Sequence, residues 1–145
     1  MKTLVRDLLK KKGHAIWSVT PQTTVYDALK VMADKNIGAV LVLEGDHPAG
    51  IFSERDYARQ VVLKGKTSKE TPVQEIMTTR VVFVRPERTI EECMALMTDK
   101  HCRHLPVLEA GKLAGLVSIG DVVKALISEK EFLIQQLESY ITSGG

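Results

Sequence analysis

The chain of 145 residues has a formal net charge of +2, with 44% hydrophobic and 26% charged residues. This composition suits one compact domain, or two halves that share a core, folding without disulfides. Lysine and arginine form no long run apart from Lys10–Lys12, which disfavours a nucleic-acid duplex as a partner. The apolar run Ile37–Leu43 is too short to span a membrane, and no signal peptide is visible at the N-terminus. We therefore expect a cytoplasmic protein.

The first half of the chain begins with the signals of a strand and a helix. A short strand is expected near Ala15–Val19. The pattern Pro21–Thr24 followed by Asp27 predicts a helix start, because the threonine hydroxyl and the acid three residues later can cap each other's backbone N–H groups. Apolar residues then recur at helical spacing, at Val25, Ala28, Leu29 and Met32.

Two further strands and a second helix follow in the first half. The run AVLVLE, residues 39–44, predicts a strand, and Gly45–Asp46 predicts a turn. The next strand ends in GIFSERD, residues 50–56, where a second helix is expected to begin at Ser53. The polar stretch 66–72 is the expected linker to the second half.

The second half repeats this order at an offset of 65 residues, without a gap from Val84 to Asp121. A strand is therefore expected near Arg80–Val84 and a turn at Ala110–Gly111. Farther upstream, Val5–Leu9 resembles Val73–Met77 at an offset of 68. An internal repeat of this length indicates a tandem duplication. The identical positions include Pro21 and Pro86, Thr24 and Thr89, Gly50 and Gly115, Ser53 and Ser118, and Asp56 and Asp121.

The duplication predicts an α/β (α+β) fold of two β-α-β-β-α repeats packed about a pseudo-two-fold axis, because each half-sheet is too small to be stable alone. The first repeat, with its N-terminal helix, is expected to cover residues 1–65, and the second residues 73–128. Residues 129–145 are expected to form an amphipathic helical tail. An apolar stripe leads into this tail and would pack on the module or on a second chain: Val123, Leu126, Ile127, Phe132, Leu133, Leu137, Tyr140 and Ile141.

The chain resembles a pair of CBS domains, the module named after cystathionine beta-synthase and also called a Bateman module, in its stand-alone bacterial form. The resemblance is carried by TPQTTVYDALKVM, IGAVLVLE and GIFSERD in the first repeat, and by RPERTIEECMALM, CRHLPVLE and GLVSIGD in the second. It implies a regulatory module without catalytic activity that pairs as a homodimer and modulates a partner protein. It also implies an adenosine nucleotide as ligand (AMP, ADP, ATP, NAD or NADH, sometimes S-adenosylmethionine), and we expect no metal.

The repeated Ser-x-x-Asp pattern has two compatible interpretations. Ser53 and Ser118 can be N-caps whose partners are Asp56 and Asp121 at the third helical position. An aspartate in the first turn of a helix can also accept hydrogen bonds from both hydroxyls of a ribose, while the N–H groups nearby favour a phosphate. The capping box alone accounts for serine and aspartate but not for the glycine and apolar pair before them.

The resemblance also implies which residues line two cross-built clefts. Ser53 and Asp56 are expected to face residues of the second repeat, and Ser118 and Asp121 residues of the first. Arg55 matches Gly120 and Arg103 matches Gly38, so the clefts should differ in charge, although either arginine could be a solvated surface residue. The Asp56 cleft would contain Thr78, Arg80, Val82, Cys102 and Arg103, the Asp121 cleft His14, Ile16, Ile37, Gly38 and Ala39, and the adenine would lie between Ile51, Val82, Ile37 and Leu116.

Two other functions are weaker candidates. The sequence VSIG around Ser118 approaches the nucleophile elbow of a hydrolase, but Leu116 occupies the place of its first glycine. Cys93 and Cys102 match Ala28 and Ile37, so they are predicted to be buried thiols rather than ligands or a disulfide. His101, Cys102 and His104 show no recognised metal-ligand spacing. A purely structural dimer without ligand is the remaining alternative.

Overall fold

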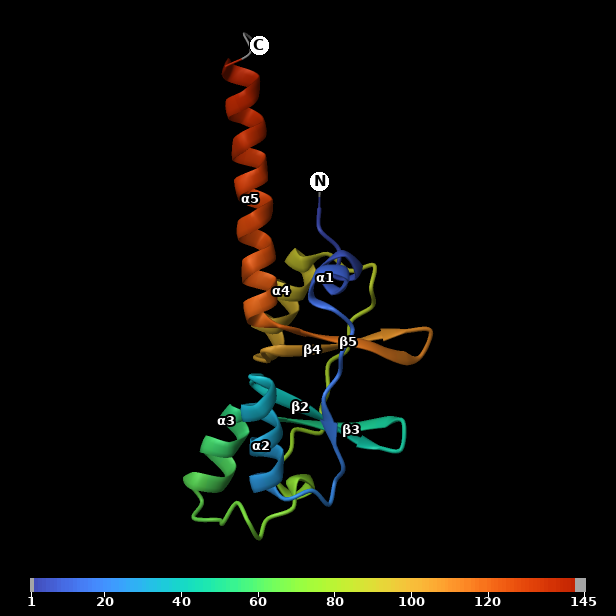
Figure 1. Ribbon diagram of the computed structural model, residues 1–145, viewed down its shortest axis with the longest axis vertical. Helices are drawn as coiled ribbons and strands as arrows, with labels where there is room; N and C mark the ends of the chain where they lie inside the picture. The colour runs from blue at the N-terminus through green and yellow to red at the C-terminus, as the bar shows by residue number, and fades with distance from the viewer. Residues whose placement is uncertain (1, 143–145) are drawn as a thin grey trace. The chain divides into compact units, whose positions relative to one another are not determined.

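The computed structural model describes residues 2–142 and shows a mixed α+β chain (Figure 1). The chain divides into two compact units, which are described separately. Unit 1 combines the N-terminal segment, up to Ala15, with the chain from Val82 onward, and unit 2 is Ile16–Val81. The predicted fold class of two small sheets with helices is confirmed.

Unit 2 is a three-stranded sheet with one helix between its first two strands and further helical segments after its last strand. Strand β1 (Ser18–Val19) pairs in parallel with β2 (Ala39–Glu44), which pairs antiparallel with β3 (His47–Ser53). The helices are α2 (Val25–Lys35), α3 (Glu54–Asp56), the π-helical continuation η1 (Tyr57–Val62) and the 3₁₀ turn η2 (Val73–Glu75). The core gathers Val25, Ala28, Met32, Val40, Val42, Phe52, Val61 and Val73.

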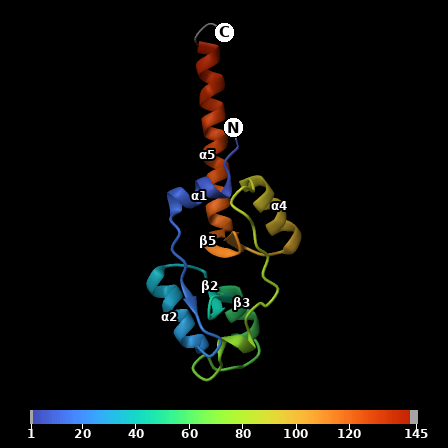
Figure 2. The same cartoon turned by 90° about the vertical axis from the view of Figure 1, so that its right-hand side faces the viewer.

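Unit 1 is a two-stranded hairpin with three helices. Strands β4 (His104–Glu109) and β5 (Lys112–Ser118) pair antiparallel, with the same irregularity in register as the pair in unit 2. Helices α1 (Val5–Lys12), α4 (Ile90–Lys100) and the first turns of α5 (Ile119–Thr142) gather on this hairpin (Figures 1 and 2). The core gathers Val5, Leu9, Ile90, Cys93, Met97, Leu105, Val107, Val117 and Val122.

The predicted helix starts and turns are present in both units. Thr24 Oγ1 accepts the N–H of Asp27 at 3.2 Å, and Thr89 forms a reciprocal capping box with Glu92. The hairpin turns lie at the two predicted positions, with residues of positive φ at Gly45, Ala110 and Gly111. Local capping and turn chemistry therefore place the helices and hairpins as the repeat predicts.

The segments that resemble each other at an offset of 68 make equivalent contacts. The N–H of Val5 donates to the carbonyl of Arg88 at 2.8 Å, and the N–H of Val73 donates to that of Thr23 at 2.7 Å. Arg6 and Gln74 repeat the match, donating to Pro86 and Pro21. The start of the first repeat, which contains Val5–Leu9, is therefore built into unit 1, and the start of the second repeat, which contains Val73–Met77, is built into unit 2.

Gly50 and Gly115 are required because these two segments approach them closely. We call the segments exchanged, because each joins the unit formed mainly by the other repeat: the N-terminal segment contacts Gly115, and the segment that contains Met77 and Thr78 contacts Gly50. A Cβ on Gly50 would lie 2.7 Å from Met77 Sδ and 2.8 Å from the carbonyl oxygen of Thr78. A Cβ on Gly115 would lie 2.7 Å from Leu9 Cδ2. Both distances are too short for a real contact, so only glycine fits without a shift of its neighbour.

The strand expected at Arg80–Val84 is wrong, because within these five residues only Val84 is paired, in an isolated bridge with Val107. In unit 2 the N–H of Leu41 donates to the carbonyl of Trp17 at 3.2 Å and extends the ladder. The residue that matches Leu41 is Pro106, which has no N–H to give to Val82. One proline thus shortens the second sheet.

The helix that follows the second repeat is continuous. Helix α5 has 24 residues, so the tail predicted from residue 129 is the second half of one helix as far as Thr142. Figure 1 shows that this half extends past the other elements of unit 1. Across residues 2–142, no helix combines the length and apolar character needed to cross a membrane.

Candidate functional site

The Asp56 half-site, defined as Ser53, Asp56 and Thr78, lies where β3 runs into α3. Ser53 Oγ accepts the N–H of Asp56 at 3.2 Å, and Asp56 Oδ2 accepts the N–H of Ser53 at 2.9 Å. The predicted capping box is therefore present. Because Oδ2 is used for the cap, the second carboxylate oxygen of Asp56 remains for another donor.

Thr78 supplies that donor. Its Oγ1 donates to Asp56 Oδ1 at 3.2 Å. The backbone of Thr78 is fixed by two hydrogen bonds with Ile51, each of 2.9 Å. Gly50 permits this approach, since a Cβ there would collide with the carbonyl of Thr78. The glycine of the repeated motif thus brings a hydroxyl from the exchanged segment to the aspartate.

The Asp121 half-site, defined as Ser118, Asp121 and Lys12, repeats the cap at the start of α5. Ser118 Oγ accepts the N–H of Asp121 at 3.2 Å, and Asp121 Oδ2 accepts the N–H of Ser118 at 2.9 Å. The additional donor here is a cation: Lys12 Nζ donates to Asp121 Oδ2 at 2.5 Å and to the carbonyl of Leu116 at 2.6 Å. Burial raises the pKa of Asp121, but the hydrogen bonds from Lys12 and Ser118 outweigh burial and leave this pKa below its usual value.

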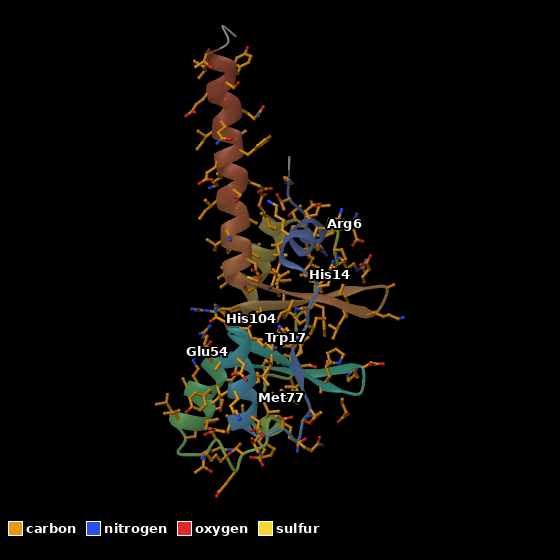
Figure 3. All side chains as sticks on the ribbon, viewed as in Figure 1. Arg6, His14, Trp17, Glu54, Met77 and His104 are labelled. Carbon is orange, nitrogen blue, oxygen red and sulfur yellow. The ribbon has the colours of Figure 1, made fainter. Side chains whose placement is uncertain are left out.

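His14 also belongs to this half-site. Its Nδ1 lies 2.8 Å from the carbonyl oxygen of Ala114 on β5, and Figure 3 shows its side chain beside that strand. Helix α1 ends at Lys12, and Gly13 follows with a positive φ of 102°. The end of α1 therefore delivers both Lys12 and His14 to β5 and the start of α5.

His104 is a titratable residue that sequence reasoning considered only as a metal ligand. It begins β4 (Figure 3), where it pairs in register with Ser118, and it is partly buried. Burial and the charges of Lys12 and Arg103 lower its pKa to about 4, although Asp121 acts in the opposite direction. Its match to Ala39, which is buried at the start of β2, was the signal that could have revealed this position.

The two units divide the predicted site residues between them. Two backbone contacts are equivalent: the N–H of Glu54 donates to the carbonyl of Gly38 at 3.1 Å, and the N–H of Ile119 to that of Arg103 at 2.8 Å. Arg103 therefore lies at the start of α5, in the unit that contains Asp121. The expected facing of residues across the two clefts stays a prediction. Unit 2 contains Ile16, Ile37, Gly38, Ala39, Ile51, Ser53, Arg55, Asp56, Thr78 and Arg80, and unit 1 contains His14, Val82, Cys102, Arg103, Leu116, Ser118 and Asp121.

The two thiols differ in burial. Cys93 is fully buried, and burial raises its pKa to about 11. The prediction that Cys102 is buried is wrong: it is only half-buried, as is Ile37 at the matching position, although burial still raises its pKa. Over the described part of the chain, no group of three or more histidine, cysteine and acidic side chains could hold a metal ion.

Comparison with known proteins gives the class that this fold and repeated site define. The family model of the CBS domain matches residues 5–63 and again residues 73–128, so the chain belongs to the CBS-domain family. A protein with CBS domains from Burkholderia ambifaria MC40-6 has a solved structure that is 55% identical, with a TM-score of 0.84 over 87% of this chain and 95% of that one.

Two further relatives extend this comparison. The mitochondrial CBS domain-containing protein CBSX3 of Arabidopsis thaliana is 41% identical over 152 residues, spanning 98% of this chain and 73% of the plant protein. The CBS domain pair of protein MJ0100 was solved in complex with 5′-methylthioadenosine and S-adenosyl-L-methionine. It is 19% identical with a TM-score of 0.77, covers 89% of this chain and 99% of that one, and therefore shares the fold.

Proposed function

We propose that this protein is a regulatory module that binds an adenosine nucleotide at its two aspartate half-sites and thereby modulates a partner protein. The observation that carries the proposal is the repeated carboxylate: Asp56 and Asp121 each close a helix cap and each receive one further polar side chain, Thr78 or Lys12. A cap alone needs neither extra donor. AMP, ADP, ATP, NAD and NADH all present the ribose that such a carboxylate would bind.

At the Asp56 half-site, a ribose hydroxyl can replace the existing hydrogen-bond donor more easily than at the Asp121 half-site. The hydrogen bond from Thr78 to Asp56 Oδ1 is exposed and neutral on the donor side. A ribose hydroxyl can take the place of the threonine hydroxyl without leaving a buried charge unpaired. The N-terminus of a helix favours negative charge, but Asp56 would repel a phosphate, so the phosphate should lie away from it near a cation. Arg55 and Arg80 of the same unit are the proposed cations.

The identity of the ligand rests on the family. The CBS domain pair of MJ0100, which shares this fold, was crystallised with two adenosine compounds. We propose that apolar residues of each unit hold the adenine, Ile37 and Ile51 in unit 2 and Val82 and Leu116 in unit 1. Binding energy that differs between two arrangements of the module would shift their populations, which is how a ligand could control a partner protein.

The function has no catalytic step in this proposal. Ser118, the candidate nucleophile, has its Oγ engaged as the acceptor of the Asp121 N–H. A serine nucleophile requires a base that takes its proton, together with an oxyanion hole. We propose the cytoplasm as the compartment and a homodimer as the assembly, and the regulated protein is unidentified.

Isothermal titration with AMP, ADP, ATP, NAD, NADH and S-adenosylmethionine tests the proposal. We expect at least one nucleotide to bind the wild type and the Asp56→Ala/Asp121→Ala variant to lose this binding while keeping its far-ultraviolet circular dichroism. Chromatography of the nucleotide after incubation should recover it unchanged. Absence of binding by every compound would favour the structural dimer, and turnover that Ser118→Ala removes would favour the hydrolase.

A further inference from the structure

The second half of α5 lacks cover from unit 1. Thr3 donates its backbone N–H to the carboxylate of Glu129, and every described residue from Lys130 to Thr142 is exposed. A helical segment of this length is marginal in water without tertiary packing. The sequence nevertheless places large apolar side chains there, which indicates that the helix is stabilised by a contact outside the unit.

One face of α5 carries a heptad pattern that defines the α5 stripe. Its residues alternate spacings of four and three, as the a and d positions of a coiled coil do. Val123 is 41% exposed, Ile127 and Ile134 are each 53% exposed, Leu137 is 56% exposed and Ile141 is 72% exposed. The core of unit 1 takes a different face of α5, on which Val122 is fully buried. The α5 stripe consists of Val123, Ile127, Lys130, Ile134, Leu137 and Ile141.

We propose that the α5 stripe binds the α5 stripe of a second copy of this chain in an antiparallel coiled coil. Antiparallel pairing matches each a position with a d position of the other helix. The register with the longest overlap places Val123 against the partner's Ile141 and Ile127 against the partner's Leu137. Leu133 would lie against its own counterpart at the two-fold axis, which extends the apolar contact.

The charges of α5 select this orientation. In the antiparallel register, Lys124 lies opposite the partner's Glu138, and this pair occurs twice in the dimer. Glu131 lies opposite the partner's Glu131 at the two-fold axis, where the Lys130 ammonium of each helix can reach the partner's Glu131 and offset the repulsion. A parallel pair would instead place Lys130 against the partner's Lys130 in the core. It would also set leucines rather than charged residues beside Glu131 and Glu138. Charge complementarity with itself is the reason for choosing a second copy as the occupant of this surface.

This inference deepens the homodimer of the proposed function but is independent of nucleotide binding. Sedimentation equilibrium of the full chain, with and without charge exchange, tests it. Lys124→Glu or Glu138→Lys should each weaken dimerisation roughly 3- to 30-fold, because each brings like charges together twice per dimer. The variant with both exchanges should regain the wild-type affinity to within about threefold. The two residues are too far apart along one helix to compensate each other within a single chain.

A second pair of variants tests the apolar contact. Ile134→Asp should weaken dimerisation by roughly 100-fold or more, since it puts a carboxylate into the contact on both helices. Phe132→Asp is the matched control: Phe132 is 51% exposed but lies on the opposite face of α5, so the dimer should persist. Equal effects of these two variants, or failure of the double charge exchange to restore the dimer, would overturn the proposal. Nucleotide titration of Ile134→Asp separates this result from failure of the proposed function.

Discussion

The two aspartate half-sites share their backbone geometry and differ in the donor that the exchanged segment brings. In each, a serine and an aspartate cap a helix with the same pair of hydrogen bonds. Asp56 then receives a neutral hydroxyl from Thr78, whereas Asp121 receives the ammonium of Lys12. Duplication has thus kept the capping framework and changed the electrostatics of the carboxylate that it presents.

This difference decides how available each carboxylate is to a ligand. A ribose that binds Asp56 must displace the neutral Thr78 hydroxyl from Oδ1. At Asp121 the Lys12 ammonium bonds to Oδ2 and neutralises the carboxylate, which makes it a weaker acceptor for a ribose hydroxyl. The Lys12 side chain is also held by the carbonyl of Leu116, so its removal from Asp121 costs a second contact. We therefore expect Asp56 to be the tighter nucleotide site, and the following variants exchange features between the repeats to test the comparison.

The largest effect should come from exchanging the proline that separates the two sheets. Leu41→Pro copies Pro106 into β2, where it removes the hydrogen bond to Trp17 and the buried leucine side chain. The free energy of unfolding, measured with urea, should fall by about 3 kcal/mol. Pro106→Leu should raise it by about 1 kcal/mol, because the new N–H can donate to Val82. Equal and small effects would contradict the assignment of the short second sheet to Pro106.

The two motif glycines should differ in their tolerance of a methyl group. Gly50→Ala places its Cβ against the backbone carbonyl of Thr78, which cannot move without breaking its bonds to Ile51. We expect the free energy of unfolding to fall by about 1–3 kcal/mol. Gly115→Ala meets only the flexible end of Leu9 and should cost less. A larger loss of unfolding free energy for Gly115→Ala in the same urea titration would show that the close approach of Thr78 is not the reason for glycine at position 50.

Much of the fold could be predicted because local chemistry determines it. Thr24, Thr89, Ser53 and Ser118 cap helices at the expected places, and the offset of 65 residues carries each observation to the other repeat. The unit to which α1 belongs could not be deduced in this way. The resemblance at an offset of 68 shows that Val5–Leu9 and Val73–Met77 are equivalent segments, but it does not show on which sheet each segment packs. The shortening of the second sheet could have been predicted from the sequence. Pro106 aligns with Leu41, and a proline there cannot donate the N–H that pairs with the neighbouring strand.

The site was predicted less completely than the fold. The serines, the aspartates and Thr78 could be placed from the resemblance, and the structure brings Thr78 to Asp56. The role of His104 was missed, because a histidine beside His101 and Cys102 was considered only as a metal ligand. Its burial depends on the charges and strands packed around it, which no local motif encodes.

His104 should make the stability of unit 1 depend on pH, whereas Ala39 at the matching position of unit 2 has no group that titrates. Its pKa is lowered to about 4 in the folded protein, so between this value and its usual pKa near 6.5 the unfolded chain binds more protons. Stability should therefore fall as the pH falls from 6.5 to 4. His104→Ala copies Ala39 and should reduce this loss by on the order of 1–3 kcal/mol. If the free energy of unfolding, measured with urea, depends on pH in the same way in the variant and the wild type, then His104 is not held neutral in the folded protein.

The smallest effect should come from releasing Asp121 from Lys12. Lys12→Met keeps the apolar stem and removes the ammonium that bonds to Asp121. In an Asp56→Ala background, titration calorimetry should show adenosine binding improved by roughly 3- to 10-fold, because an ammonium no longer neutralises the carboxylate. The gain for AMP should be smaller, since Lys12 could otherwise bind its phosphate. Weaker adenosine binding would mean that Lys12 holds the ligand instead of weakening the carboxylate as an acceptor.

The ranking of the two half-sites is tested most directly by titrating AMP into Asp56→Ala and Asp121→Ala in parallel. A hydrogen bond to a charged group contributes about 1.5–3 kcal/mol, so Asp56→Ala should weaken the tighter site by roughly 10- to 150-fold. Asp121→Ala should leave that site within about threefold of the wild type. If Asp121→Ala instead abolishes binding while Asp56→Ala leaves it unchanged, the availability of the carboxylate does not decide affinity, and the account of the two half-sites is wrong.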